Sequence, residues 1–551
     1  MTRLDTSIRR PPSACTRTGC LPALRAWWIA IAIASTAPLA SAIAADDGGG
    51  TPAPRRAIDI NEYRVEGADH LSQVEVETAL APFMGPGRDL EDVEKARLAL
   101  EKAYSDKGYQ AVTVAIPPQK VRDGIVTLKV TEGTVGRLRV RGSSWYSLSE
   151  IKREAPSLAE GTVPNFNDIV RDIVVLNQLP DRRVTPALRA GALPNTIDVD
   201  LNVTDRSPVH ASLDVNNRYS AGTTPTRLNG SLRYENLWQQ GHSLSFGFQT
   251  APARFSDAKV FSLTYLARFL DVPWLTASVN GVLQNSDIST LGADAVQGRG
   301  RTAGARLGFT LPGPSMLFHN LSAGLDFKYY GKDIPNDPLG MPVHYVPLSA
   351  QYVASWAGDS SQTQASATVL FNLRGLSSSD AAFDSKRYNA TGSFVTTRVE
   401  ASRTEDLRGQ FQLFARALGF FSPGPLIPSE QQTLGGAESV RGYLEAQAAG
   451  DRVALGAFEA RSPSLFRWLG GGSGSWLQEW RFHVFAEGGR VALRDPLPEQ
   501  QSLFYLASTG GGTRVQLGMF HGELDVGVPL RSVGSIERYK PRFHFRLAGE
   551  F

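Results

Sequence analysis

The second half of the chain alternates between apolar and polar side chains, in short segments of about ten residues. The clearest segment has apolar positions two residues apart: Leu321, Ala323, Leu325, Phe327 and Tyr329. Because successive side chains of a strand point to opposite faces, such a segment predicts a strand with one apolar and one polar face. Sixteen segments of this kind follow one another from Val209 onwards. An even number of antiparallel strands with alternating faces is typical of a transmembrane β-barrel, predicted here over 207–551.

Residues 58–206 follow a different pattern, in which strand-like and helical segments occur in one order that is used twice. The first unit, 58–133, has a predicted helix over 90–107 with these apolar residues on one face: Leu90, Val93, Ala96, Leu100 and Tyr104. Asp89 is expected to cap this helix and Gly108 to end it. The second unit, 134–206, has a capping box expected at Ser147 and Glu150. We therefore predict two β-α-α-β-β modules ahead of the barrel.

The first 45 residues have the pattern of a secretory signal peptide. Five arginines precede an apolar stretch, 26–39, and small residues suited to cleavage follow at 40–44. A Gly- and Pro-rich linker, 46–57, comes next. Both cysteines, Cys15 and Cys20, lie in the predicted signal peptide, so disulfides, thiol catalysis and thiolate metal sites are not expected after export. No later stretch is apolar for the roughly 18 residues of a spanning helix, which again favours a barrel.

Composition and motifs narrow the function classes. The net charge is only +3 over 551 residues, so a nucleic-acid partner is not expected. The nucleotide-binding pattern GxxxxGK[ST] is absent, and the eight histidines lack H-x-x-x-H or H-E-x-x-H spacing, so neither a metal nor another cofactor is expected. A lipase-like GDS at 358–360 falls in a predicted turn, where these residues are common. The protein is therefore not expected to be an enzyme.

One stretch of the predicted barrel, 420–451, lacks strand alternation although strands flank it. It contains three glycines, at 435, 436 and 442, and the motif Val440-Arg441-Gly442-Tyr443. Arg441 is the only cation between 431 and 450, and its planar guanidinium suits a fixed carboxylate partner. The alternative is an exposed loop with a solvated arginine. If both modules lie at the inner side, this is the sixth outward connection, and other long ones are predicted at 284–300, 330–345 and 375–389.

With these features, the chain resembles the outer-membrane transporters of two-partner secretion (TpsB proteins of the haemolysin secretion/activation type, ShlB/FhaC/HecB) within the Omp85 superfamily. The resemblance rests on two modules similar to POTRA domains, a sixteen-stranded barrel, the VRGY loop and the terminal Phe551. It implies that the loop folds into the lumen and that Arg441 pairs with the acid of a strand motif, F-x-D-x-G. The matching stretch here is Phe485-Ala486-Glu487-Gly488-Gly489, with Glu487 in place of Asp.

Strand alternation places Glu487 on the lumen side of its strand, and two other acids, Glu459 and Asp525, also face inward as alternative partners of Arg441. Family members often carry an N-terminal helix that plugs the pore. The linker at 46–57 is too short for such a plug, so either the loop alone closes the barrel or the barrel is leakier.

The resemblance also implies a location and a function. The protein would lie in the outer membrane of a Gram-negative bacterium, with its POTRA-like modules in the periplasm. It would recognise an unfolded TpsA-type exoprotein, of haemolysin or adhesin type, and secrete it through the barrel. Its other partners would be the lipid bilayer and the barrel-assembly machinery, with Phe551 as the C-terminal assembly signal. The alternatives are a barrel-assembly factor of the same superfamily, which usually has more modules, and a passive solute porin.

Overall fold

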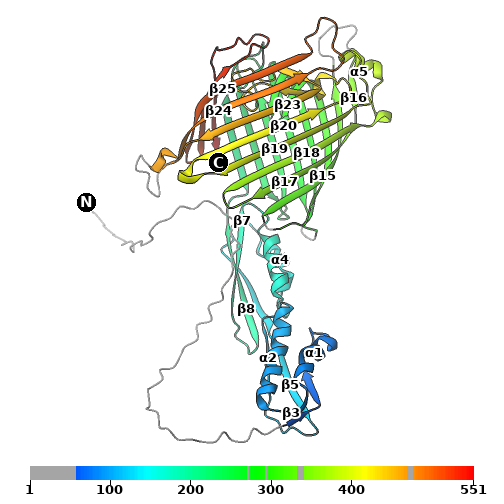
Figure 1. The fold of residues 1–551 in the computed structure, drawn as a ribbon, viewed down its shortest axis with the longest axis vertical. Helices are drawn as coiled ribbons and strands as arrows, with labels where there is room; N and C mark the ends of the chain where they lie inside the picture. The colour runs from blue at the N-terminus through cyan, green and yellow to red at the C-terminus, as the bar shows by residue number, and fades with distance from the viewer. Residues whose placement is uncertain (1–57, 270–271, 292–293, 315, 332–340, 468–475) are drawn as a thin grey trace, which may run out of the picture. The chain divides into compact units, whose positions relative to one another are not determined.

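The computed structural model describes residues 58–269, 272–291, 294–314, 316–331, 341–467 and 476–551. They form two small α/β modules and a closed antiparallel barrel whose strands run diagonally side by side (Figure 1). The predicted signal peptide and linker, 1–57, lie outside the described residues. Within the described parts of the chain, no helix is both long and apolar enough to span a membrane.

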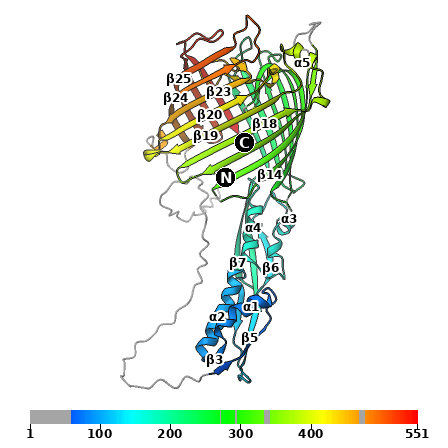
Figure 2. The same ribbon diagram turned by 45° about the vertical axis from the view of Figure 1, so that its right-hand side comes forward.

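The first module combines a three-stranded sheet with two helices, which lie beside β5 in Figure 2. Its elements are β1 (Ile58–Ile60), β2 (Glu62–Glu66), α1 (Gln73–Leu80), β3 (Gly85–Arg88), α2 (Leu90–Asp106), β4 (Val112–Ala115) and β5 (Ile125–Glu132). Asp89 caps α2 as predicted, through a capping box with Asp92, and Gly108 follows the helix with a φ of +100°. The predicted apolar face is wrong at Leu90, which is 72% exposed because it occupies the first helical position, beyond the sheet.

The second module repeats this order with β6 (Thr134–Arg141), α3 (Leu148–Arg153), α4 (Phe166–Leu176), β7 (Arg182–Ala190) and β8 (Thr196–Asp205). In both modules the first strand of the three-stranded sheet pairs in parallel with the last strand, β2 with β5 and β6 with β8. The capping box predicted at Ser147 is wrong: Ser147 is the N-cap of α3, but its hydroxyl lies 2.8 Å from the Ser149 hydroxyl and makes no capping bond.

The barrel closes by pairing of its last strand, β27, with its first, β9. Its strands are β9 (Val209–Asn216), β10 (Arg227–Leu237), β11 (His242–Thr250), β12 (Ala258–Arg268), β13 (Leu275–Leu291), β14 (Asp294–Thr310), β15 (Leu317–Tyr330), β16 (Val343–Tyr345), β17 (Pro347–Ala357), β18 (Ser361–Asn372), β19 (Val395–Asp406), β20 (Gln412–Phe421), β23 (Arg452–Arg461), β24 (Leu477–Ala492), β25 (Leu503–Leu517), β26 (Phe520–Pro529) and β27 (Arg542–Glu550). Both β16 and β17 pair with β15 and form one interrupted strand, so the described residues confirm the predicted sixteen-stranded barrel.

The outer surface of the barrel is apolar and its lumen is polar. On β27, Phe543 and Leu547 are 63% and 56% exposed, whereas His544 between them is 7% exposed. Other exposed apolar side chains continue this surface around the barrel: Leu232, Phe246, Leu263, Leu283, Leu307, Leu325, Phe327, Val399, Phe482 and Leu524. A band of this kind is typical of a barrel that faces lipid.

We call the end of the barrel at which β9 begins the inner end, and the opposite end the outer end. The outer connection predicted at 284–300 is wrong, because β13 and β14 remain paired as far as Leu291 and Asp294. The sequence of this stretch does not alternate regularly between apolar and polar residues, although the strand ladder continues. A strand that extends beyond lipid needs no apolar face. The connection around 375–389 does leave the sheet and contains a short helix, α5 (Asp380–Lys386).

Candidate functional site in the barrel lumen

The stretch from 422 to 451, here called loop 6, connects β20 to β23 and turns back into the barrel. Two short strands, β21 (Gln432–Leu434) and β22 (Ala448–Gly450), pair to form its stem. Beyond them lies the tip, 435–446, in which the three glycines have φ angles of +109°, +107° and +91°. The tip is held together internally: the Gly435 N–H donates to the Ser439 hydroxyl over 2.9 Å, and the Ala437 N–H donates to the Glu445 carboxylate over 2.9 Å.

Two residues of the VRGY motif fix the tip by packing. Val440 and Tyr443 are fully buried in an apolar cluster between the loop and the barrel wall, formed with Leu418, Leu434, Leu455, Val491, Leu506, Val533 and Ile536. The Tyr443 hydroxyl donates to the Arg531 carbonyl over 2.7 Å and accepts from the Ala507 N–H over 3.3 Å. These contacts leave the intervening Arg441 directed at the wall.

Arg441 reaches three carboxylates from three strands at once. Its Nη2 lies 2.6 Å from Glu487 on β24 and 2.9 Å from Glu459 on β23, and its Nη1 lies 3.0 Å from Asp525 on β26. The backbone N–H of Arg441 also donates to Glu487, over 2.6 Å. The Arg441 side chain is only 6% exposed. The structure thus brings Arg441 to the acid named by the family motif and, at the same time, to both alternative acids.

The guanidinium also stacks on an aromatic ring. The Cζ atom of Arg441 lies 3.5 Å from the centre of the Phe485 ring, which belongs to the same strand motif as Glu487 and is buried. A cation over a desolvated aromatic face contributes about 2 kcal/mol. Phe485 therefore supports the arginine from one face while the carboxylates bind its edge.

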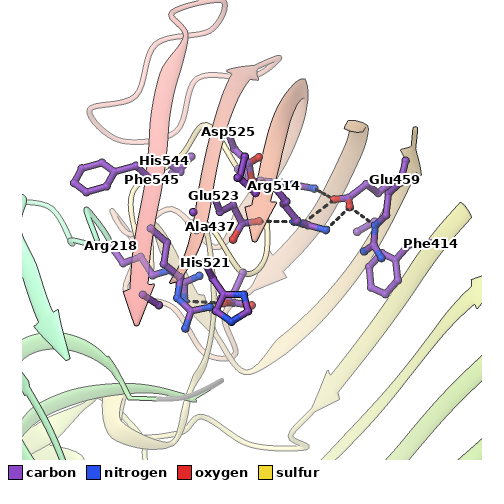
Figure 3. Close-up of a pocket in the computed structure, with 18 of the residues that line it drawn as sticks. Arg218, Phe414, Ala437, Glu459, Arg514, His521, Glu523, Asp525, His544 and Phe545 are labelled. Carbon is purple, nitrogen blue, oxygen red and sulfur yellow. Dashed lines mark hydrogen bonds and ion pairs between the residues drawn. The ribbon is translucent and has the colours of Figure 1, made fainter. Parts of the chain in front are cut away.

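Further cations balance the acids of this cluster. Glu459 also pairs with Arg461 over 2.7 Å and with Arg514 over 2.9 Å, and Arg514 continues to Glu523 over 2.8 Å. Figure 3 shows Arg514 between Glu459 and Glu523 at the edge of a cavity of about 510 Å³. The cavity lies on the inner side of the tip, and its lining is rich in both arginine and carboxylate side chains. Within the described part of the chain, no three His, Cys, Asp or Glu side chains are arranged to hold a metal ion.

The tip also contacts the last strands through backbone. Gly442 approaches Gly527 on β26 so closely that a β-carbon at 527 would stand 2.5 Å from the Gly442 nitrogen. The Gly442 N–H donates to Nε2 of His544 on β27 over 2.9 Å. His483 on β24 binds the other oxygen of Asp525 over 2.7 Å. Sequence reasoning missed both histidines as partners of the tip, although alternation along their strands places both toward the lumen.

A second anchor at the outer end, also missed, holds the stem. Asp451 is fully buried, and its carboxylate accepts from Arg387 over 2.6 Å and from the N–H groups of Leu426 and Arg494 over 3.0 and 2.7 Å. Arg387 directly follows α5 in the preceding outer connection. Phe383 of that helix packs with Tyr345, Phe394, Leu426 and Ile427. The sequence shows an aspartate directly before β23, but its donors come from loops whose paths the sequence does not specify.

Comparison with known families decides the classification. Residues 58–133 match the POTRA domain, ShlB-type, and residues 236–551, more than half of the chain, match the Omp85 superfamily domain. The chain belongs to the Omp85 superfamily. The ShlB-type POTRA domain and the relatives described next place this Omp85 protein among the transporters of two-partner secretion, which confirms the resemblance.

Two curated relatives and one solved structure illustrate the relationship. The outer membrane transporter CdiB of Dickeya dadantii (strain 3937) is 22% identical over 436 residues, which cover 72% of this chain and 70% of the relative. The heme/hemopexin transporter protein HuxB of Haemophilus influenzae is 20% identical over 384 residues, covering 68% and 66%. The structure of CdiB from Escherichia coli has the same fold, with a TM-score of 0.63 and 19% identity over 94% of both chains. This Omp85 protein is therefore an outer-membrane barrel with N-terminal POTRA architecture, of a family whose members carry a secreted exoprotein across that membrane.

Proposed function

We propose that this Omp85 protein binds an unfolded exoprotein in the periplasm through its two modules and secretes it through the barrel, with the tip of loop 6 as the gate. The observation that carries the proposal is the burial of Arg441 among Glu459, Glu487 and Asp525 inside the lumen. A buried arginine on a loop, bound to carboxylates of the wall, is a discrete connection that transport can break and remake.

The modules support the recognition step because the outermost strands of each described sheet pair with another strand on one side only. The strand order is β2-β5-β4 in the first module and β6-β8-β7 in the second, so β2, β4, β6 and β7 are edge strands. An extended client segment can add to such an edge by main-chain hydrogen bonds, which tolerate many sequences. This type of pairing suits a client of haemolysin or adhesin type that is still unfolded.

The polar lumen supports the transport step. Charged side chains of both signs line the cavity on the inner side of the tip, including Arg514, Glu523 and Arg546. Such a surface keeps the lumen hydrated for a passing backbone. Because both signs of charge are present, it does not bind positively or negatively charged client segments strongly. Folding of the exoprotein outside the cell would supply the energy. Phe551 pairs through its backbone with Ala211 beside the closing seam, over 2.8 and 3.1 Å, and is the proposed signal for insertion by the barrel-assembly machinery.

Complementation of export tests the gate directly. Cells that lack the chain receive the wild type, Arg441→Ala or the control Arg306→Ala, and the exoprotein in the medium is quantified. Arg306 is a matched control, because it pairs with Asp326 in the lumen over 2.8 Å without touching loop 6. We expect at least a tenfold loss of export for Arg441→Ala, because three buried carboxylates lose a shared cation, at about 3–5 kcal/mol.

The control should export normally, and both variants should insert as folded barrels. Export by Arg441→Ala at the wild-type level would refute a gating role of the tip. A general fall in other outer-membrane barrels would instead favour a barrel-assembly factor, and a change confined to small-solute uptake would favour a porin.

A further inference from the structure

The last barrel strand makes a contact with the tip of loop 6 that depends on a proton. The Gly442 N–H lies 2.9 Å from Nε2 of His544. A backbone N–H can only donate, so Nε2 of His544 must carry a lone pair and no proton. The observed position of the tip therefore requires a neutral imidazole on β27.

Neighbouring contacts leave Gly442 little freedom to turn away. Arg441, the preceding residue, is held by three carboxylates, and Tyr443, the following residue, is fully buried. On its other side Gly442 lies against the backbone of Gly527 on β26. Because the peptide is fixed on all sides, the direction of its N–H is fixed as well, and His544 lies where that N–H points.

The charged groups that face His544 come from four elements. They are Arg441 of loop 6, Asp525 of β26, Arg542 of β27 itself and Arg218 of the connection after β9. Asp525 is already bound by Arg441 over 3.0 Å and by His483 of β24 over 2.7 Å. A proton on Nε2 of His544 would thus remove the acceptor of the Gly442 N–H and add a cation beside three arginines, with one occupied carboxylate nearby.

We propose that His544 is a positioning residue that holds the Arg441–Gly442 tip in the lumen, and that it does so only in its neutral form. The proposal deepens the proposed gating function and rests on it. Because burial and three neighbouring arginines oppose a further cation, a proton on this imidazole requires stronger acid than a proton on an exposed histidine. Acidification therefore breaks the Gly442–His544 hydrogen bond, repels Arg441 and releases the tip.

Channel conductance of the purified protein in planar lipid bilayers tests this inference without any exoprotein, so its failure is separate from a failure of export. Conductance of the wild type should rise at least twofold between pH 7.5 and pH 3.5. His544→Gln keeps an acceptor oxygen that does not titrate and should conduct little at both pH values. His544→Lys has donors alone and should conduct as much at pH 7.5 as the wild type does at pH 3.5.

Two controls test other titratable groups near the tip. Glu445→Gln removes the acid that accepts the Ala437 N–H within the tip, and His521→Gln removes a cavity histidine of β26. Both should keep the pH response of the wild type. A wild type without a pH response, or a His544→Gln variant that retains the wild-type response, would overturn the proposal.

Heat-modifiable migration on gels shows whether each variant is folded. Should the variants at 544 not fold, a nitroxide at Ala437→Cys reports the tip in otherwise unchanged protein, because the sequence has cysteines only at 15 and 20. The label should become mobile at pH 3.5 both in this background and with Glu445→Gln added. Equal mobility at the two pH values would overturn the proposal.

Discussion

At the scale of single residues, the site is a balance of buried and partly buried charges. Three carboxylates, Glu459, Glu487 and Asp525, meet three guanidinium groups, Arg441, Arg461 and Arg514, at 2.6 to 3.0 Å. Only Arg441 belongs to loop 6. The wall keeps two of its own cations near Glu459, whereas Glu487 depends on the arginine that the loop supplies. Glu487 is therefore the wall residue whose charge is most sensitive to the position of the tip.

Substitution of Glu487 tests this dependence. Glu487→Asp restores the residue of the family motif and should export within about threefold of the wild type, since two other acids still hold Arg441. Glu487→Lys places a cation against Arg441 in a buried site and should abolish export, because unpaired buried like charges cost several kcal/mol. The amount of exoprotein in the medium, divided by the amount of folded barrel in the membrane, checks both variants. Equal export by the two variants would remove this carboxylate from the account.

Sequence reasoning reached part of this site and stopped at a physical limit. Alternation and the motif identify Arg441, Glu487 and the inward direction of Glu459 and Asp525. From alternation and the motif alone, the three acids are alternative partners of Arg441. Alternation shows which face of a strand a residue is on, but not how neighbouring strands are staggered. The register brings Glu459 opposite Phe485, two residues along the strand from Glu487, and Gly512 opposite Asp525. Only this stagger shows that one guanidinium reaches all three acids.

At the scale of elements, loop 6 has two separate anchors. The tip is bound through Arg441 and Gly442, while the stem is bound at the outer end through Asp451, Arg387 and the cluster around Phe383. The stem anchor includes a helix from another outer connection, α5, so it does not depend on the lumen. Release of the tip therefore leaves the stem attached, and the moving part of the loop is the segment beyond β21 and β22.

Asp451→Asn tests the stem anchor. The substitution keeps the shape but leaves Arg387, which is 11% exposed, without its carboxylate, and should destabilise the stem by roughly 2–4 kcal/mol. Protease cleavage within 422–431 of the folded barrel should then become faster. The control Asp495→Asn changes an exposed outer-end acid bonded to Asn389 over 2.9 Å and should cleave as slowly as the wild type. Identical cleavage of all three proteins would contradict the stem anchor.

In the first module, one acid joins the helices to the sheet. Glu132 at the end of β5 accepts from Tyr104 of α2 over 2.9 Å and from the N–H groups of Asp69 and His70 over 3.1 Å. Burial raises the pKa of this carboxyl, but hydrogen bonds from His70 and Tyr104 outweigh burial, so its pKa lies below the usual value. The stability that the carboxylate contributes is therefore complete above its unfolded pKa and is lost as the pH falls through the lower, folded pKa.

Amide hydrogen exchange of the full chain, corrected for intrinsic rates, checks this contribution. Glu132→Gln should lower the opening free energy of β5 and α2 by about 1–3 kcal/mol at pH 7, because charge-assisted hydrogen bonds are lost. The same variant should lose less protection between pH 7 and pH 3 than the wild type does. Glu66→Gln, at an exposed position of β2, is the control and should leave exchange unchanged. Wild-type protection in Glu132→Gln would contradict the role of this acid.

The strands and helices could be predicted from the sequence where one of their faces is apolar, and less well elsewhere. Burial against lipid or a core imposes a clear period, so the sixteen strands and the order of the modules follow from the sequence. The sequence of the outer parts of β13 and β14 does not alternate regularly between apolar and polar residues, so no period marks them. Ser147 and Leu90 are local errors, because a suitable residue type does not ensure that a cap forms or that a first-turn side chain reaches the core.

At the scale of the whole molecule, we propose one transport cycle. It uses the closed barrel, the edge strands of the two modules and loop 6. The modules bind an extended segment, the tip of loop 6 leaves its three carboxylates, and the segment passes through a lumen lined by both charges. The tip then returns, Arg441 binds the three carboxylates again, and the lumen is closed. In this account the client is one exoprotein, and transport of other barrels or of small solutes is unaffected.

The most direct test compares the proteins in the medium of cells with and without this chain, by quantitative mass spectrometry, together with their outer-membrane barrels. The account predicts the loss of one large secreted protein from the medium, restored by the wild-type chain and not by Arg441→Ala, with the other barrels at normal levels. An unchanged set of secreted proteins, or a general fall in outer-membrane barrels, would contradict it.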